Sequence, residues 1–150
     1  MQATRALREK AMQLLAADTA TLAQAANANL IVLCTNQIAP SELMVMADID
    51  EATFDGYAAL EVGLNAQPEA LDPSNADSII DLIPPVTGFR WETTGLTNLP
   101  QTIYGFALCN QAKTILFAAQ LLPAPVTLTG TNQRVDVGAP TLRQGAGSIS

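Results

Sequence analysis

From residue 78 onward the chain consists of short apolar runs separated by turn-forming residues at fairly regular spacing. This rhythm is typical of a β-sandwich or a jelly roll. Prolines fall between the runs, where a missing N–H costs no ladder hydrogen bond: Pro84, Pro85, Pro100, Pro123, Pro125 and Pro140. We therefore predict a mainly β fold, a jelly roll or a β-sandwich. Its strands are expected at residues 78–83, 88–94, 102–109, 114–121, 126–129, 134–137 and 141–149.

Three further strands are predicted before residue 78. Residues 30–35 form a continuous apolar run rich in branched side chains, which fits a strand buried on both faces. Residues 43–47 and 57–64 are the other two, and Asp55-Gly56 is a turn signal between them. Residues 65–78 are rich in proline, asparagine and acids, so we expect an exposed loop there.

The N-terminal part of the chain has a helical pattern. Residues 3–17 are helix formers, and their apolar side chains recur at helical spacing on one stripe: Leu7, Ala11, Leu14 and Leu15. We predict a short α-helical arm at residues 1–26 and a single β body at residues 27–150. The stripe is rich in alanine and lacks Trp or Phe anchors, so docking on a partner is expected rather than contact with a membrane.

The composition indicates self-association. Hydrophobic residues make up 49% of the chain and charged residues 14%, against about 25% charged in a typical globular protein. Obligate interfaces resemble a domain core cut in half. We therefore expect a homo-oligomer, because sister subunits would cover part of the apolar surface.

The charge distribution excludes some partners. The net charge is −7, and residues 42–81 contain ten acids and no base. Nucleic-acid binding needs clustered Lys and Arg, and the four that follow residue 10 are too sparse to form a stripe: Arg90, Lys113, Arg134 and Arg143. No apolar run approaches the roughly 18 residues that span a bilayer, and the N-terminus has no secretory signal pattern. We expect no nucleic-acid or membrane partner and a chain made in the cytoplasm.

The sequence contains no histidine, which removes the commonest general base and the most frequent metal ligand. Paired carboxylates could still act as acid and base, and the acids between Asp48 and Asp55 could bind Ca²⁺. However, Ala52 stands where the EF-hand pattern needs a third ligand, so a solvated loop with Asp50 capping a turn is favoured. We predict no enzyme activity, no catalytic residue, no cofactor and no metal.

Aromatic residues and cysteines have competing interpretations. Trp91, Tyr104 and their neighbours Phe89 and Phe106 could form a sugar-binding platform, but strand alternation favours core positions for most of them. Cys34 and Cys109 lie in apolar runs and are expected to be buried free thiols. A disulfide between them would need adjacent strands with suitable geometry.

Four segments carry a family resemblance: residues 14–18 leading into 30–33, then 51–57, 91–95 and 104–108. Together they resemble small virion structural proteins of tailed bacteriophages, over residues 14–150. The resemblance implies a cement or decoration protein on the outer capsid surface, often a trimer, which binds the major capsid protein and stabilises the head. It implies assembly in the host cytoplasm and carries over no catalytic residue.

Two functions of other classes remain as alternatives. A receptor-binding or tail-fibre module would use the loop at residues 65–78 and an aromatic face against a host glycan. A depolymerising enzyme would depend on a single carboxylate, and the sequence offers it almost no support.

Overall fold

The computed structural model describes residues 2–3, 29–41, 43–66, 78–83, 88–138 and 141–144. Almost all regular structure in these residues is β, as predicted. The strands are β1 (Gln2–Ala3), β2 (Asn29–Cys34), β3 (Leu60–Ala66), β4 (Ser78–Ile83), β5 (Phe89–Glu92), β6 (Gln101–Asn110), β7 (Leu116–Leu128), β8 (Arg134–Val137) and β9 (Thr141–Gln144), and a 3-10 turn, η1, spans Met46–Asp48.

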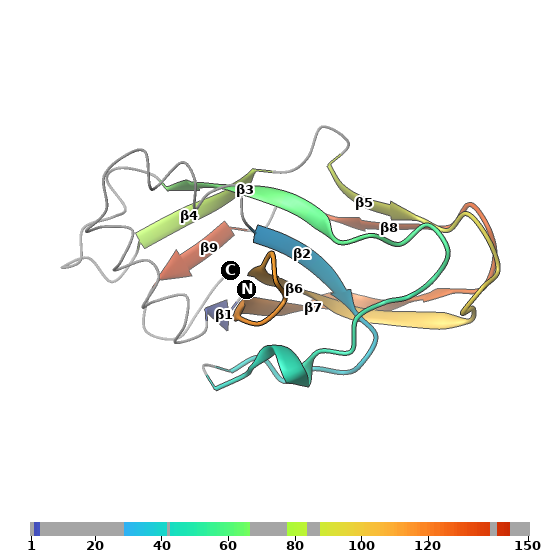
Figure 1. Cartoon of the computed structure of the whole chain (residues 1–150), viewed down its shortest axis with the longest axis horizontal. Helices are drawn as coiled ribbons and strands as arrows, with labels where there is room; N and C mark the ends of the chain where they lie inside the picture. The colour runs from blue at the N-terminus through green and yellow to red at the C-terminus, as the bar shows by residue number, and fades with distance from the viewer. Residues whose placement is uncertain are drawn as a thin grey trace.

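Two antiparallel sheets make a β-sandwich (Figure 1). The larger sheet has the order β1-β7-β6-β2-β3-β4-β9, and the smaller sheet pairs β5 with β8. The larger sheet curls, so its terminal strands β1 and β9 lie beside each other. The connections β5–β6 and β7–β8 both join the two sheets at one end of the molecule (Figure 1).

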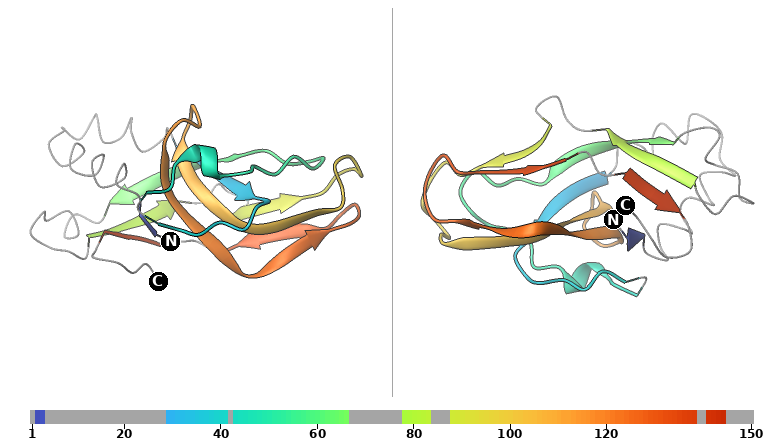
Figure 2. Two further views of the ribbon diagram at one scale, coloured as in Figure 1. Left: turned by 90° about the horizontal axis from the view of Figure 1, so that it is seen from below. Right: turned by 180° about the vertical axis from the view of Figure 1, so that it is seen from behind.

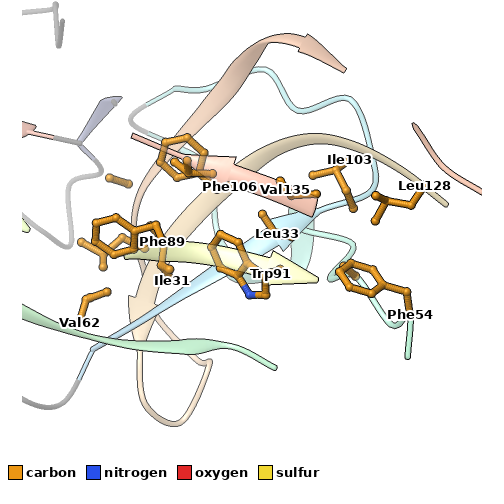
Figure 3. Packing of buried hydrophobic residues seen from close by; sticks show 14 of the residues in the cluster. Ile31, Leu33, Phe54, Val62, Phe89, Trp91, Ile103, Phe106, Leu128 and Val135 are labelled. Atoms are coloured by element: carbon orange, nitrogen blue, oxygen red, sulfur yellow. The ribbon is translucent and has the colours of Figure 1, made fainter. Parts of the chain in front are cut away.

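The main core lies between the sheets (Figure 3). Strand alternation puts Phe89 and Trp91 of β5 inward, while Arg90 between them faces out. The larger sheet supplies the opposing side chains, and β8 and the segment before β3 complete the cluster: Ile31, Leu33, Ile103, Leu108, Phe117, Val135, Val137, Ala52 and Phe54. Trp91 also donates a hydrogen bond from Nε1 to the carbonyl oxygen of Ala58 at 2.8 Å.

A second, smaller core covers the other face of the larger sheet. All six residues of β2 are buried, because Ile31 and Leu33 face the main core and Leu30, Val32 and Cys34 face the second one. The prediction that this strand is buried on both faces is confirmed. The cover consists of side chains from residues 38–49, which cross this face.

Several strand predictions differ from the structure. The strand predicted at residues 57–64 is β3, at 60–66, and the loop predicted at 65–78 overlaps the ends of β3 and β4 and otherwise lies outside the described residues. Residues 43–47 do not form a strand; Met46 and Ala47 belong to η1. The runs at 114–121 and 126–129 are one strand, β7, so Pro123 and Pro125 lie inside a strand rather than between strands. The register explains how β7 tolerates them. Ile103 pairs with Val126 and Gly105 with Leu121, so residues 122–125 oppose a single residue of β6 in a bulge, where the regular ladder is interrupted.

The predicted N-terminal helix is largely outside the described residues. Its first residue, Ala3, is in β1 and pairs with Ala118 of β7, so a helix does not begin there. Residues 4–28 are not described, and these include the stripe Leu7, Ala11, Leu14 and Leu15. None of the helices formed by the described residues has the length and apolar character needed to traverse a lipid bilayer.

Candidate functional site

The structure brings two segments that are distant in the sequence, residues 51–57 and 91–98, into direct contact. The N–H of Thr94 donates to the carbonyl oxygen of Asp55 at 2.9 Å. The N–H of Thr97 donates to Asp55 Oδ2 at 3.2 Å, and Asn98 Nδ2 donates to the carbonyl oxygen of Thr53 at 2.9 Å. Residues 51–57 and 91–98 are therefore interlocked at the end of the sandwich where the sheets are joined.

Two glycines make this close approach possible. Gly56 has a φ of +92°, and a side chain there would clash with the carbonyl oxygen of Glu92. A Cβ at Gly95 would collide with the carboxylate of Asp55. The close packing of the two segments therefore requires glycine at these two positions.

Thr93 ties the two connections between the sheets together. It is fully buried, and its hydroxyl donates to the carbonyl oxygen of Gly130 at 2.7 Å. The same hydroxyl accepts the N–H of Gln133 at 2.9 Å, and the backbone of Thr93 is bonded to Gln133 and Asn132. The polar groups of this end are used to hold the loops, which indicates a structural role for them.

A second polar cluster lies around Glu51. Tyr57 donates its hydroxyl proton to Glu51 Oε1 at 2.8 Å and accepts the N–H of Leu33 at 3.2 Å. Lys113 Nζ lies 2.7 Å and 2.8 Å from the two carboxylate oxygens of Glu51. Burial, followed by the bond to Glu51, raises the pKa of Tyr57 above its usual range. The Tyr57 hydroxyl is therefore protonated. It takes the place of a neighbouring strand as the hydrogen-bond partner of the Leu33 N–H in β2.

The acids between residues 48 and 55 do not converge. Asp48 Oδ2 accepts the N–H of Val45 at 2.9 Å, Glu51 is paired with Lys113, and Asp55 is bonded to Thr97. Within the described ranges, no group of three or more acids, cysteines or histidines is arranged to hold a metal ion. The residue that caps the turn is Asp48; the prediction had named Asp50.

The aromatic residues do not form an exposed platform. Phe89, Trp91 and Phe106 are 3–4% exposed and belong to the main core, whereas Tyr104 is only partly buried. The core interpretation is therefore confirmed for three of the four rings, and the sugar-binding alternative loses its central residue, Trp91.

The thiols of Cys34 and Cys109 are buried and free, as predicted. Their strands are adjacent, but Cys34 pairs with Gly105 and Cys109 with Leu30. The offset of four residues is about 13 Å along a strand, too far for a disulfide. Burial is the main reason that the pKa of Cys34 is raised to about 12 and that of Cys109 to about 11, from 9.0.

We expect neither thiol to react with a disulfide reagent at about pH 8 in the folded protein, because each is buried and protonated. Both should react in denaturant. Between pH 9 and the raised pKa values the unfolded chain loses thiol protons that the folded chain keeps, so the free energy of unfolding should fall as the pH rises. The double variant Cys34→Ala/Cys109→Ala is the control, with a smaller alkaline decline. Rapid labelling of the native chain would contradict this.

The remaining candidate is the loop at residues 36–50, which we call the Ω-loop; Glu42 is the one residue of it that is not described. The side chain of Asn36 closes its base, donating to the carbonyl oxygen of Asp48 at 2.8 Å and accepting the N–H of Asp50 at 3.0 Å. Thr35 adds a backbone bond to Asp50 at 2.8 Å. A closed base of this kind is typical of compact, often functional surface loops.

The inner side of the Ω-loop covers the second core, and its outer side exposes two large apolar side chains. Ile38 and Ile49 are buried against β2, β6 and β7, with Met44 and Met46 packed beside them. Leu43 and Val45 point away and are 86% and 55% exposed. In the view from below, the loop crosses in front of the larger sheet (Figure 2). We call the exposed residues Leu43, Val45, Asp48 and Asp50 the Ω-loop face.

Neither acid of the Ω-loop face is in contact with a cation in the described part of the chain. Asp48 and Asp50 are exposed and neither is in an ion pair with a described residue. The three cations whose side chains are described are each paired elsewhere: Arg90 with Asp136, Lys113 with Glu51 and Arg134 with Glu92. The face therefore combines exposed apolar side chains with uncompensated negative charge.

The outer face of the smaller sheet has the opposite character. Arg90 and Glu92 of β5 lie directly across from Asp136 and Arg134 of β8, and both cross-strand pairs are in salt-bridge contact. These four charges cancel and suit contact with water. β5 and β8 lie on the other side of the molecule from the Ω-loop in two views (Figures 1 and 2). The side with the Ω-loop therefore suits contact with a protein partner better than the side with β5 and β8.

Sequence reasoning missed the Ω-loop face because it assigned residues 43–47 to a strand. The signal in the sequence was Pro40-Ser41 before the segment and the acids after it, which favour a loop. The predicted partner-binding residues lie outside the described residues: Leu7, Ala11, Leu14 and Leu15. Comparison with protein-family models, curated proteins and solved structures finds no match for the chain.

Proposed function

We propose that the chain is a structural virion protein of the capsid cement or decoration type. It forms a homo-oligomer, with a trimer favoured, and binds the major capsid protein at the outer surface of the head. The observation that carries the proposal is the Ω-loop face, where Leu43 is 86% exposed on a loop whose base is closed by Asn36. An exposed apolar side chain on a loop that is closed at its base suits a permanent partner.

The two-sided surface supports this role. A decoration protein needs one side that attaches and another that faces water. The Ω-loop face offers apolar contacts, while the outer face of β5 and β8 carries two balanced ion pairs. Repeated attachment of several such subunits would multiply a weak individual affinity.

The chemistry-bearing side chains support a structural role as well. Thr93, Asp55 and Glu51 are all committed to hydrogen bonds or ion pairs that hold loops together. Trp91, the residue on which a glycan-binding alternative depended, is 3% exposed. The phage resemblance of residues 51–57 and 91–95 supports the virion setting.

The test is the amount of this protein in purified particles from the virus that encodes it. Quantitative mass spectrometry should find it in a constant molar ratio to the major capsid protein. A second arm treats heads that lack the protein with the purified chain, and saturable binding to the shell is expected. A handful of copies per particle, in the tail fraction, would contradict the cement role and support a receptor-binding tip.

A further inference from the structure

We infer that the Ω-loop face of one copy binds the basic, apolar N-terminal segment of a second copy, residues 4–17. This inference deepens the proposed function and rests on it for the existence of an oligomer. Leu43 and Val45 would contact the stripe of Leu7, Ala11, Leu14 and Leu15, and the acids beside them would face Arg5, Arg8 and Lys10.

The first argument is charge complementarity. The chain has seven Lys and Arg residues. Arg90, Lys113 and Arg134 are already paired with acids, and Arg143 is the one Lys or Arg that follows Arg134 in the sequence. Three of the seven gather within residues 5–10. This is the chain's own concentration of positive charge, and it matches a face that carries Asp48 and Asp50 without a cation.

The second argument is the match of apolar groups. The sequence periodicity of residues 3–17 predicts one apolar stripe with the bases off it, which is the pattern of a helix that lies against an apolar surface. The Ω-loop face offers two large apolar side chains two residues apart, Leu43 and Val45. The apolar stripe and the apolar side chains of the Ω-loop face would therefore cover each other.

The third argument is where the segment is attached. Ala3 ends β1 and Asn29 begins β2, two strands of the larger sheet that are separated by β7 and β6, so residues 4–28 are joined at both ends to one sheet. A segment held at both ends by its own sheet stays with its subunit when it binds another. Since donor and receiving surfaces differ, the contact is head-to-tail, and such a contact generates a closed ring, such as a trimer, when the rotation between subunits closes.

The experiment measures the oligomer by sedimentation velocity over a concentration series. Leu43→Ser/Val45→Ser should weaken association at least about tenfold, and neither substitution touches a core position. The matched control is Leu96→Ser, which removes an apolar side chain that is 65% exposed at the far end of the sandwich. Association of the control should equal that of the unmodified chain. Equal association of the Ω-loop variant would overturn the inference.

Charge reversal identifies the occupant. Arg8→Glu and Asp50→Lys should each weaken association about tenfold, and an equimolar mixture of the two variants should recover it in part, because in a mixed trimer opposite charges meet at all contacts but one. Loss without recovery in the mixture would show a different occupant or a contact within one chain, and would overturn the inference.

The two proposals fail differently. A wild-type chain that is monomeric but saturates capsid shells overturns the arm contact and leaves the cement role in place. A chain that assembles through the Ω-loop face but is missing from purified heads overturns the cement role and supports the contact.

Discussion

Replacing Trp91 by alanine is expected to lower the free energy of unfolding by about 3–5 kcal/mol, the range for losing a large buried ring. The indole is 3% exposed between the sheets, and its Nε1 is bonded to Ala58. Equilibrium unfolding in urea would measure the change. The size of this effect decides between a core residue and a binding residue.

Two control variants sharpen the Trp91 experiment. Trp91→Phe keeps a ring but leaves the carbonyl oxygen of Ala58 without its donor, so it should cost about 1–3 kcal/mol. Leu96→Ala removes an exposed side chain and should change stability by less than about 0.5 kcal/mol. A Trp91→Ala variant as stable as Leu96→Ala would show that the ring does not support the core.

Gly56→Ala is the second substitution with a large expected effect, about 3 kcal/mol or more. Gly56 combines a φ of +92° with backbone contact to Glu92, so an alanine brings both backbone strain and a collision. The clash would separate the interlocked segments 51–57 and 91–98. Thermal or urea unfolding would measure the loss.

Gly88→Ala is the matched control, because Gly88 also has a positive φ, +74°, but nothing lies within 4 Å of an added Cβ. It should cost only the strain, about 1 kcal/mol. The difference between the two variants isolates the collision with Glu92. Equal costs would mean that the close packing of the two segments contributes little to stability.

Much of the β body could be predicted because local signals were strong. The run at 30–35 is apolar without interruption, and β2 is buried on both faces. Residues 78–83 and 134–137 have the predicted bounds, since turn residues flank each run. Alternation placed Phe89 and Trp91 in the core and left Arg90 outside.

What could not be predicted depends on distant contacts. The bond between Thr97 and Asp55 joins residues 42 positions apart, so no local pattern reveals it. Pro123 and Pro125 are strand breakers by local rules, and only the register with β6 shows the bulge that accepts them. The exposure of Leu43 follows from the closed base of the Ω-loop, which a short apolar run cannot distinguish from a strand.

The prolines of β7 affect how copies of the protein interact when many of them lie close together. In the described residues, β1 covers the outer edge of β7 only at Ala118 and Ala119. Beyond them, Pro123 and Pro125 offer no N–H to an incoming strand. A neighbouring molecule would find an incomplete template for sheet extension, so dense packing on a surface should not lead to fibre growth. The same two residues that make the strand hard to recognise in the sequence are thus expected to limit aggregation at high local concentration.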